Sequence, residues 1–111
     1  SSSNPKAPGM LKSHYSPRKP LFINGLSQIL ENYSKEKIGY LSFQKAIENL
    51  PLENQRILSL KGSYTEAAKH LFSYMRQLDS LPIDVIYSEL LPEKDLGRAI
   101  NDRIRRAAVR E

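Results

Sequence analysis

The hydrophobic and polar positions divide the chain into a polar leading segment and a body in which apolar runs alternate with amphipathic stretches. Short apolar runs that end at turn residues are typical of buried strands, whereas apolar residues recurring every three or four positions are typical of helices. Residues 44–54 stay ambiguous, because Pro51 interrupts a helical spacing. The pattern predicts strands at residues 21–23, 38–43, 56–60 and 83–89, and helices at 27–33, from 64 to before Pro82, and at 96–108.

The helix that begins after Ser63 is the best-defined element. Ser63 and Glu66 have the spacing of a capping box, in which each side chain satisfies a backbone amide at the helix start. Pro82 ends the helix. One apolar stripe is predicted to face the core, formed by Ala68, Leu71, Phe72, Met75 and Leu78.

The last helix is predicted to start at Asp95, whose carboxylate would act as the N-cap. Its arginines fall largely outside the apolar stripe and are expected to face solvent and the carboxyl end, where cations suit the helix dipole. The predicted buried face consists of Leu96, Ala99, Ile100, Ile104, Ala107 and Ala108.

Strands that alternate with helical stretches indicate the α/β class. We expect a small three-layer, Rossmann-like domain at residues 21–111, with a mostly parallel sheet of four or five strands and helices on both faces. The order of the strands does not follow from this pattern.

Residues 1–20 are interpreted as a flexible interdomain linker. They hold four of the seven prolines, which exclude a helix or a central strand, and they offer little to bury. They also carry four basic residues and no acid, whereas the other 91 residues hold 13 basic and 12 acidic side chains. The surplus charge therefore lies mostly on the linker, which makes the body alone a poor nucleic-acid binder.

Composition excludes several classes of site and protein. The 111 residues fit a single domain. The absence of cysteine excludes disulfides, thiolate metal sites and thiol nucleophiles. No apolar run approaches the roughly 20 residues of a membrane-spanning helix. These features predict a soluble, cytoplasmic protein with no membrane partner. The chain opens with Ser1 rather than methionine, so we expect a fragment of a longer protein.

No standard catalytic motif is present. The chain lacks a Walker loop and a G-x-G-x-x-G motif. His14 and His70 are too isolated for a metal site, so we assign neither a catalytic nor a metal-binding residue. Four acids cluster near the carboxyl end of the last strand, where α/β sheets bind ligands, although loop solvation and helix capping explain them equally well. These acids are Glu89, Glu93, Asp95 and Asp102.

Two segments together resemble one family. Residues 8–17, Pro-Gly-Met-Leu-Lys-Ser-His-Tyr-Ser-Pro, resemble the P-G-M-K-Y-R-H-Y-A-P interdomain linker of the longer threonylcarbamoyl-AMP synthases, the YrdC-like/Sua-type translation factor family. Residues 68–108 resemble the carboxy-terminal domain of the same enzymes. Its L-R-x-L-D segment is similar to residues 75–79, and its L-G-x-A-I-x-x-R-L-R-x-A-A segment to residues 96–108, with Asp95 in place of a preceding glycine.

The resemblance implies a parent enzyme that condenses ATP, L-threonine and bicarbonate into threonylcarbamoyl-adenylate, which feeds tRNA threonylcarbamoyladenosine modification. The chemistry would belong to a YrdC-like catalytic domain in the same chain, with ATP, accompanied by Mg²⁺, bound there and no cofactor in this part. Contact with tRNA would be indirect, through the pathway. The linker would fold across the catalytic cavity and gate it, and the residues implied are Met10, Lys12, His14, Tyr15 and Pro17.

The leading hypothesis is therefore a regulatory domain that is inactive alone. Two alternatives stay open: an RNA- or protein-docking module, suggested by the basic linker and the arginines of the last helix, and a nucleotide-binding domain at the strand ends. Glu89, Gly97 and Arg103 are the candidates for a ligand or interdomain contact. We expect Gly97 to permit close packing on the strand before it and Arg103 to tie the last helix to the strand end.

Overall fold

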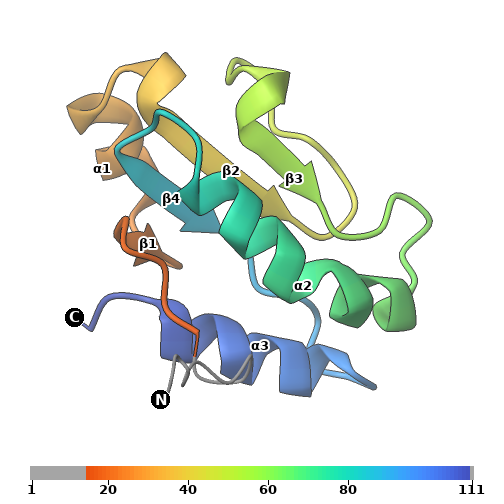
Figure 1. Cartoon of the computed structure of the whole chain (residues 1–111). Helices are drawn as coiled ribbons and strands as arrows, with labels where there is room; N and C mark the ends of the chain where they lie inside the picture. The colour runs from red at the N-terminus through yellow and green to blue at the C-terminus, as the bar shows by residue number, and fades with distance from the viewer. Residues whose placement is uncertain (1–14, 111) are drawn as a thin grey trace.

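The computed structural model describes residues 15–110 and forms an α/β fold around one parallel sheet. The chain order is β1 (Leu21–Phe22), α1 (Leu26–Asn32), η2 (Lys35–Lys37), β2 (Ile38–Ser42), η3 (Leu52–Asn54), β3 (Gln55–Ile57), α2 (Tyr64–Asp79), β4 (Val85–Ser88) and α3 (Gly97–Ala107). The predicted fold class is confirmed (Figure 1).

The sheet has the strand order β1-β4-β2-β3, and every neighbouring pair is parallel. The last strand, β4, therefore lies between β1 and β2. In the register, Ile86 is opposite Leu21 of β1 and Gly39 of β2. Because all strands run the same way, their carboxyl ends meet at one edge of the sheet.

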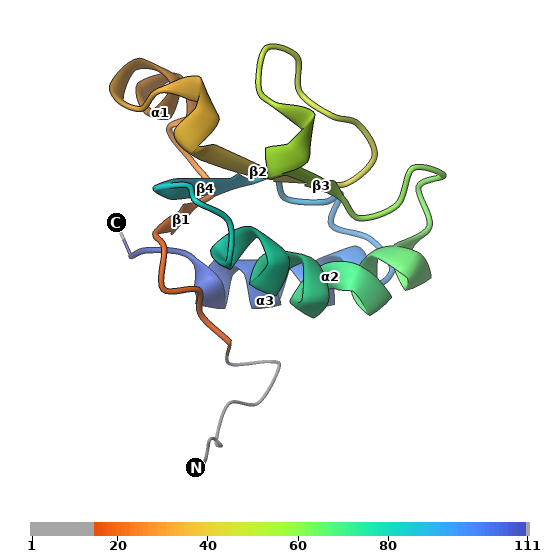
Figure 2. The ribbon, with the colours of Figure 1, turned by 45° about the horizontal axis from the view of Figure 1, so that its top comes forward.

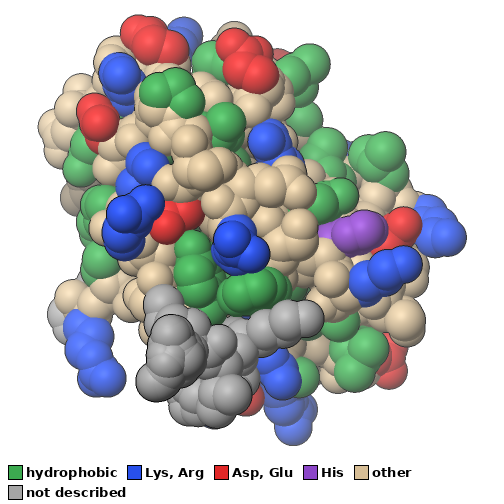
Figure 3. All heavy atoms as spheres, viewed as in Figure 1, with side chains coloured by type: hydrophobic (Ala, Val, Ile, Leu, Met, Phe, Trp, Pro, Cys, Tyr) green, Lys and Arg blue, Asp and Glu red, His purple; other side chains and the backbone are tan. Residues whose placement is uncertain are grey.

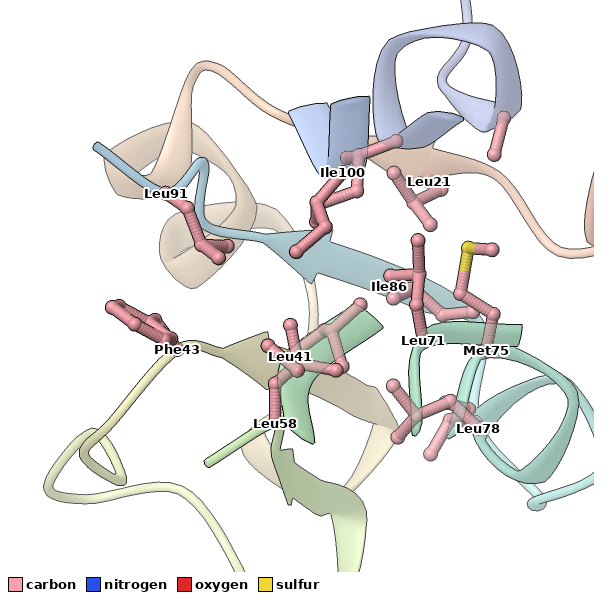
Figure 4. Packing of buried hydrophobic residues seen from close by; sticks show 14 residues of the cluster. Leu21, Leu41, Phe43, Leu58, Leu71, Met75, Leu78, Ile86, Leu91 and Ile100 are labelled. Atoms are coloured by element: carbon pink, nitrogen blue, oxygen red, sulfur yellow. The ribbon is translucent and has the colours of Figure 1, made fainter. Parts of the chain in front are cut away.

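The sheet separates two layers, as Figure 2 shows: α2 and α3 cover one face, and α1 lies on the other. Successive side chains of a strand point to opposite faces, so β2 and β4 contribute to two cores. Leu41 and Ile86 join the larger core beneath α2 and α3 (Figure 4). Tyr40 and Val85 join the smaller core beside Ile29 of α1.

The start of α2 follows the sequence closely. The Ser63 hydroxyl accepts a hydrogen bond from the Glu66 amide at 3.1 Å, as in a capping box. The reciprocal bond is replaced: the Ser63 amide donates to the Ser59 hydroxyl, and that hydroxyl donates to the Glu66 carboxylate. Within the predicted stripe, Leu71, Met75 and Leu78 are buried, but Ala67 is buried in place of the exposed Ala68.

The start of α3 differs from the prediction. The N-cap position is Leu96, and Asp95 makes no capping bond. Two tight turns precede the helix, closed by hydrogen bonds from the Lys94 amide to the Pro92 carbonyl and from the Gly97 amide to the Lys94 carbonyl. They place Asp95 in the left-handed region, at φ 51°, outside the extended conformation typical of an N-cap. Leu96, predicted to be buried, is 43% exposed.

Among residues 15–110, no helix has the length and hydrophobicity needed to cross a membrane.

Candidate functional site

The carboxylate of Asp79, the last residue of α2, binds the segment that precedes β1. It is buried, with 8% of the residue exposed. One oxygen, Oδ2, accepts hydrogen bonds from the Tyr15 hydroxyl and the Arg18 amide, both at 3.1 Å. The other, Oδ1, accepts one from the Lys19 amide at 3.0 Å. Three donors from one segment therefore converge on a single carboxylate.

Further bonds tie the same segment to three elements of the fold. The Lys19 ammonium group donates to the Asp79 carbonyl at the end of α2. The Ser16 hydroxyl donates to the Ala107 carbonyl of α3 at 3.5 Å. The Pro20 carbonyl accepts from the Ile86 amide of β4 at 2.9 Å. Residues 15–20 are thus fixed to the domain before the first strand begins.

Aromatic packing completes this arrangement. The Tyr15 ring meets the Phe72 ring of α2 edge to face, with centroids 5.1 Å apart, and the Arg76 guanidinium lies over the same Phe72 ring at 5.7 Å. Pro17 is buried. On the face shown in Figure 3, Lys and Arg side chains border hydrophobic side chains over α2. We call residues 15–20 together with Phe72, Arg76 and Asp79 the linker anchor.

Electrostatics keep the anchor in one protonation state near neutral pH. Burial would raise the pKa of Asp79, but hydrogen bonds from the Lys19 and Arg18 amides and from Tyr15 outweigh it and hold this pKa below its ordinary value. Burial raises the pKa of Tyr15 to about 12, and the charge and hydrogen bond of Asp79 act in the same direction. Asp79 is therefore an anion that accepts, and Tyr15 a neutral phenol that donates.

A second carboxylate, that of Glu89, lies at the carboxyl edge of the sheet. It accepts hydrogen bonds from the Tyr40 hydroxyl at 2.9 Å and from the Phe43 amide at 3.2 Å. Burial raises the pKa of Tyr40, and the bond to Glu89 adds to the effect. Glu89 therefore joins the end of β4 to the end of β2, at the edge where α/β sheets bind ligands.

Gly97 has the packing role that we expected, although its neighbour is a loop rather than a strand. A Cβ atom on Gly97 would lie 2.1 Å from the Pro92 carbonyl oxygen and 3.0 Å from the Tyr64 ring. A residue with a Cβ atom at position 97 would therefore clash with the Pro92 backbone.

Arg103 does not tie α3 to the strand end, contrary to the prediction. It is exposed, and its guanidinium donates to the Ala99 carbonyl of its own helix at 3.1 Å. Glu93 has the bridging role instead, because it accepts from Asn101 and Arg105 of α3.

The predicted site residues therefore separate into three groups. Met10, Lys12 and His14 lie outside the described residues. Tyr15 and Pro17 belong to the linker anchor. Glu89, Gly97 and Arg103 contact different partners and do not form one site. Within residues 15–110, no group of three or more histidine or acidic side chains is placed to hold a metal ion.

Sequence reasoning did not assign two important polar residues to a site. Asp79 stands at the carboxyl end of a helix, where the dipole disfavours an anion, and this unusual position was a signal that it serves a partner. Asn101 occurs on the apolar face of α3, and its amide exchanges two hydrogen bonds of 2.8 Å with the backbone of Leu91. A polar residue on an apolar stripe is the signal that could have revealed it.

Comparison with known proteins gives one consistent family. The family model described as "Threonylcarbamoyl-AMP synthase, C-terminal domain" matches residues 1–109. The threonylcarbamoyl-AMP synthase of Pyrococcus abyssi is 27% identical over 114 residues, covering 93% of this chain and 32% of that relative. The Schizosaccharomyces pombe synthase is 31% identical over 120 residues, covering 94% and 29%.

A solved structure agrees with these relatives. It is titled "Crystal structure of P. abyssi Sua5 complexed with L-threonine" and matches with a TM-score of 0.64 and 27% identity, over 97% of this chain and 33% of that chain. The Bacillus subtilis synthase, 24% identical, is likewise covered over 32% of its length. The chain thus spans about a third of the length of these relatives.

Proposed function

The chain belongs to the family of the threonylcarbamoyl-AMP synthase C-terminal domain, and from this premise we propose that it is the regulatory domain of such an enzyme. Its leading segment would gate the active site of a YrdC-like catalytic domain in the same protein. ATP, with its Mg²⁺, L-threonine and bicarbonate would bind that catalytic domain, and no step of the chemistry is assigned to this chain. The protein would act on tRNA only through its product.

The linker anchor is the observation that carries the gating role. A gate needs a fixed end and a free end, and the bonds from residues 15–19 to Asp79 supply the fixed end. The free end would contain Met10, Lys12 and His14. Closing such a segment over the catalytic cavity would exclude water and protect the carbamate and the mixed anhydride from hydrolysis.

The two alternative functions have less support. An RNA-docking surface along α3 would need several unpaired cations, and two of its arginines are paired with Glu93: Arg105 at 3.0 Å and Arg98 at 3.9 Å. A nucleotide site at the strand ends would place phosphate beside the Glu89 carboxylate, which already joins β2 to β4.

The proposal is tested by pyrophosphate release from ATP, threonine and bicarbonate. Three proteins are compared: the full-length enzyme that contains this chain, the 111-residue chain alone, and the full-length enzyme with Met10 and His14 changed to alanine. We expect activity from the first, none from the second, and from the third a lower yield of threonylcarbamoyl-adenylate per pyrophosphate. The matched control is Ser2→Ala in the same linker. Release of pyrophosphate by the chain alone, or an unchanged yield from the double variant, would refute the proposal.

A further inference from the structure

We infer that Arg56 closes the free edge of the sheet at β3, and that its removal lets β3 pair with the same strand of a second copy of the chain. An edge strand turns backbone N–H and C=O groups outward, where they can pair with a strand of another molecule. The strand order β1-β4-β2-β3 leaves two edges, β1 and β3 (Figure 1). Self-association of the domain is a property separate from the proposed gating.

The β1 edge is covered by backbone of the same chain. The Ile86 amide of β4 donates to the Pro20 carbonyl, and successive residues of a strand direct their backbone groups to alternate sides. The groups of Leu21 therefore point away from β4. The Leu21 carbonyl accepts a hydrogen bond of 2.9 Å from the Val109 amide, which belongs to the segment after α3. An added strand finds this carbonyl already bonded.

At the other edge, Gln55 and Ile57 are the residues of β3 that turn their backbone groups outward. The direction follows from the Leu58 amide, which donates to the Ser42 carbonyl of β2 at 2.8 Å. The outward Gln55 amide is already used, because it donates to the Leu52 carbonyl of η3. The Gln55 carbonyl and the Ile57 groups are therefore the ones through which an added strand would pair.

The Arg56 guanidinium occupies that carbonyl. Its Nη1 atom donates to the Gln55 carbonyl at 2.8 Å and to the Glu53 carbonyl at 3.0 Å. Its Nε atom donates to Gln77 Oε1 of α2 at 2.7 Å, and Gln77 Nε2 in turn donates to the Ser73 hydroxyl at 3.2 Å. Side chains of α2 thus hold the guanidinium over the edge of the sheet.

An arginine suits this position because its donors point in different directions. Nε donates toward α2 while Nη1 donates toward the edge, whereas a lysine has a single nitrogen. All three acceptors are neutral oxygens, two of the backbone and one of the Gln77 amide, so the bonds cover polar groups rather than pair charges. With the Gln55 carbonyl covered, the Ile57 groups are what remains of β3 for an incoming strand, and one residue is too short for a stable ladder.

A second copy of the chain is the partner that fits an opened edge. When two β3 strands pair antiparallel about a twofold axis at position 56, Gln55 of one copy lies opposite Ile57 of the other. Each Gln55 carbonyl then accepts from the Ile57 amide of the second copy, and the symmetry repeats the bond. Leu52 and Leu60, on either side of β3, are 71% and 76% exposed and supply apolar surface that such a pair would bury.

Sedimentation velocity of the 111-residue chain at increasing concentration provides the first test. We expect the unmodified chain to remain monomeric and Arg56→Ala to form a dimer whose fraction rises with concentration. Arg103→Ala is the matched control: it removes an arginine that is exposed and bonds its own helix α3, and it should remain monomeric. A monomeric Arg56→Ala at every concentration, or equal association of the unmodified chain, would overturn the inference.

Hydrogen exchange followed by NMR locates the contact. In Arg56→Ala we expect exchange at the Ile57 amide to slow about fivefold or more from dilute to concentrated samples, while exchange at Leu30 of α1 stays constant. Adding Ile57→Pro removes this outward donor and leaves the bonds to β2 in place, so the double variant should return to a monomer. A dimer with unchanged exchange at Ile57, or one that persists in the double variant, would contradict pairing through β3.

The effect of lost stability alone is measured with Ile29→Val. Ile29 is buried in the smaller core on the opposite face of the sheet from α2, so valine lowers the melting temperature without changing the β3 edge. We expect this variant to remain monomeric, whereas dimerisation comparable to that of Arg56→Ala would refute a specific role for Arg56.

Discussion

Two carboxylates in this domain make nearly the same contacts and do different work. Asp79 accepts from a tyrosine hydroxyl and two backbone amides, and Glu89 accepts from a tyrosine hydroxyl and one backbone amide. The partners of Glu89 belong to β2 and the residue after it, so this carboxylate joins two parts of the sheet. The partners of Asp79 all precede the first strand. The number and type of contacts do not distinguish the two carboxylates. They differ in the segment that each one binds.

The difference also bears on the site of the proposed function. The carboxyl edge of a parallel sheet is the usual ligand site of α/β folds. Here Glu89 accepts hydrogen bonds that join the ends of β2 and β4, and the contacts of the linker anchor lie near the carboxyl ends of α2 and α3. The linker anchor is therefore the feature on which the proposed action on a neighbouring domain rests.

The largest expected loss of stability comes from removing the Asp79 carboxylate. Asp79→Ala removes the acceptor of three hydrogen bonds to a charged group, and we expect it to lower the free energy of unfolding by about 2 kcal/mol. Urea denaturation measures the loss, and NMR shifts should locate it at residues 15–20. Shift changes spread equally over β2 and β4 would show that the two sites are not independent.

The corresponding change at the sheet edge is expected to cost less. Glu89→Gln keeps one acceptor oxygen for the Tyr40 hydroxyl or the Phe43 amide and loses the other, so we expect a loss of about 1 kcal/mol. In the same urea experiment, exchange at Phe43 should accelerate while exchange at Arg18 and Lys19 stays as in the unmodified chain. Faster exchange at Lys19 would contradict the separation.

The tyrosines provide a smaller, matched pair of changes. Tyr15→Phe and Tyr40→Phe each delete one hydroxyl, and we expect each to cost ~0.5–1 kcal/mol. Spectroscopic titration adds a direct check on the first site: Tyr15, with a pKa raised to about 12, should titrate closer to its ordinary value of 10.0 in Asp79→Asn. A titration unaffected by that substitution would exclude the Tyr15–Asp79 bond.

The stability that Asp79 contributes should be lost only at acid pH. Because the pKa of Asp79 is lower in the folded chain than its ordinary value of 3.8, the stability that it contributes is present above this value and is lost as pH falls through the lower folded pKa. The Lys19 amide shift between pH 5 and 2 reports the transition, which should be missing in Asp79→Asn.

Periodicity and capping predicted much of the fold because they depend on local residues. The Ser63 cap, the stripe containing Leu71 and Met75, and the apolar run at Ile38 each identify an element from a few neighbouring positions. The strand order did not follow, because it depends on which strands pair across the whole chain. Asp95 was misassigned because two consecutive tight turns, which its side chain does not reveal, set its backbone conformation.

The candidate site was less predictable for a related reason. A charged side chain can form hydrogen bonds or ion pairs with many partners. Arg103 therefore donates to a carbonyl of its own helix, and Glu93, rather than Arg103, connects α3 to the preceding loop. The role of Asp79 depends on a segment 60 residues earlier in the chain. No local pattern encodes that separation.

The central claim is that the leading segment reaches the substrates bound to a neighbouring domain. Because the 111 residues contain no cysteine, Met10→Cys gives this chain a single site for a nitroxide spin label, and any accessible cysteine elsewhere in the full-length enzyme is first replaced. The NMR relaxation of the threonine methyl group is then measured with ATP bound. The account predicts strong paramagnetic enhancement from the label at position 10 and little from a label at position 30, on α1. Equal enhancement from the two positions would contradict it.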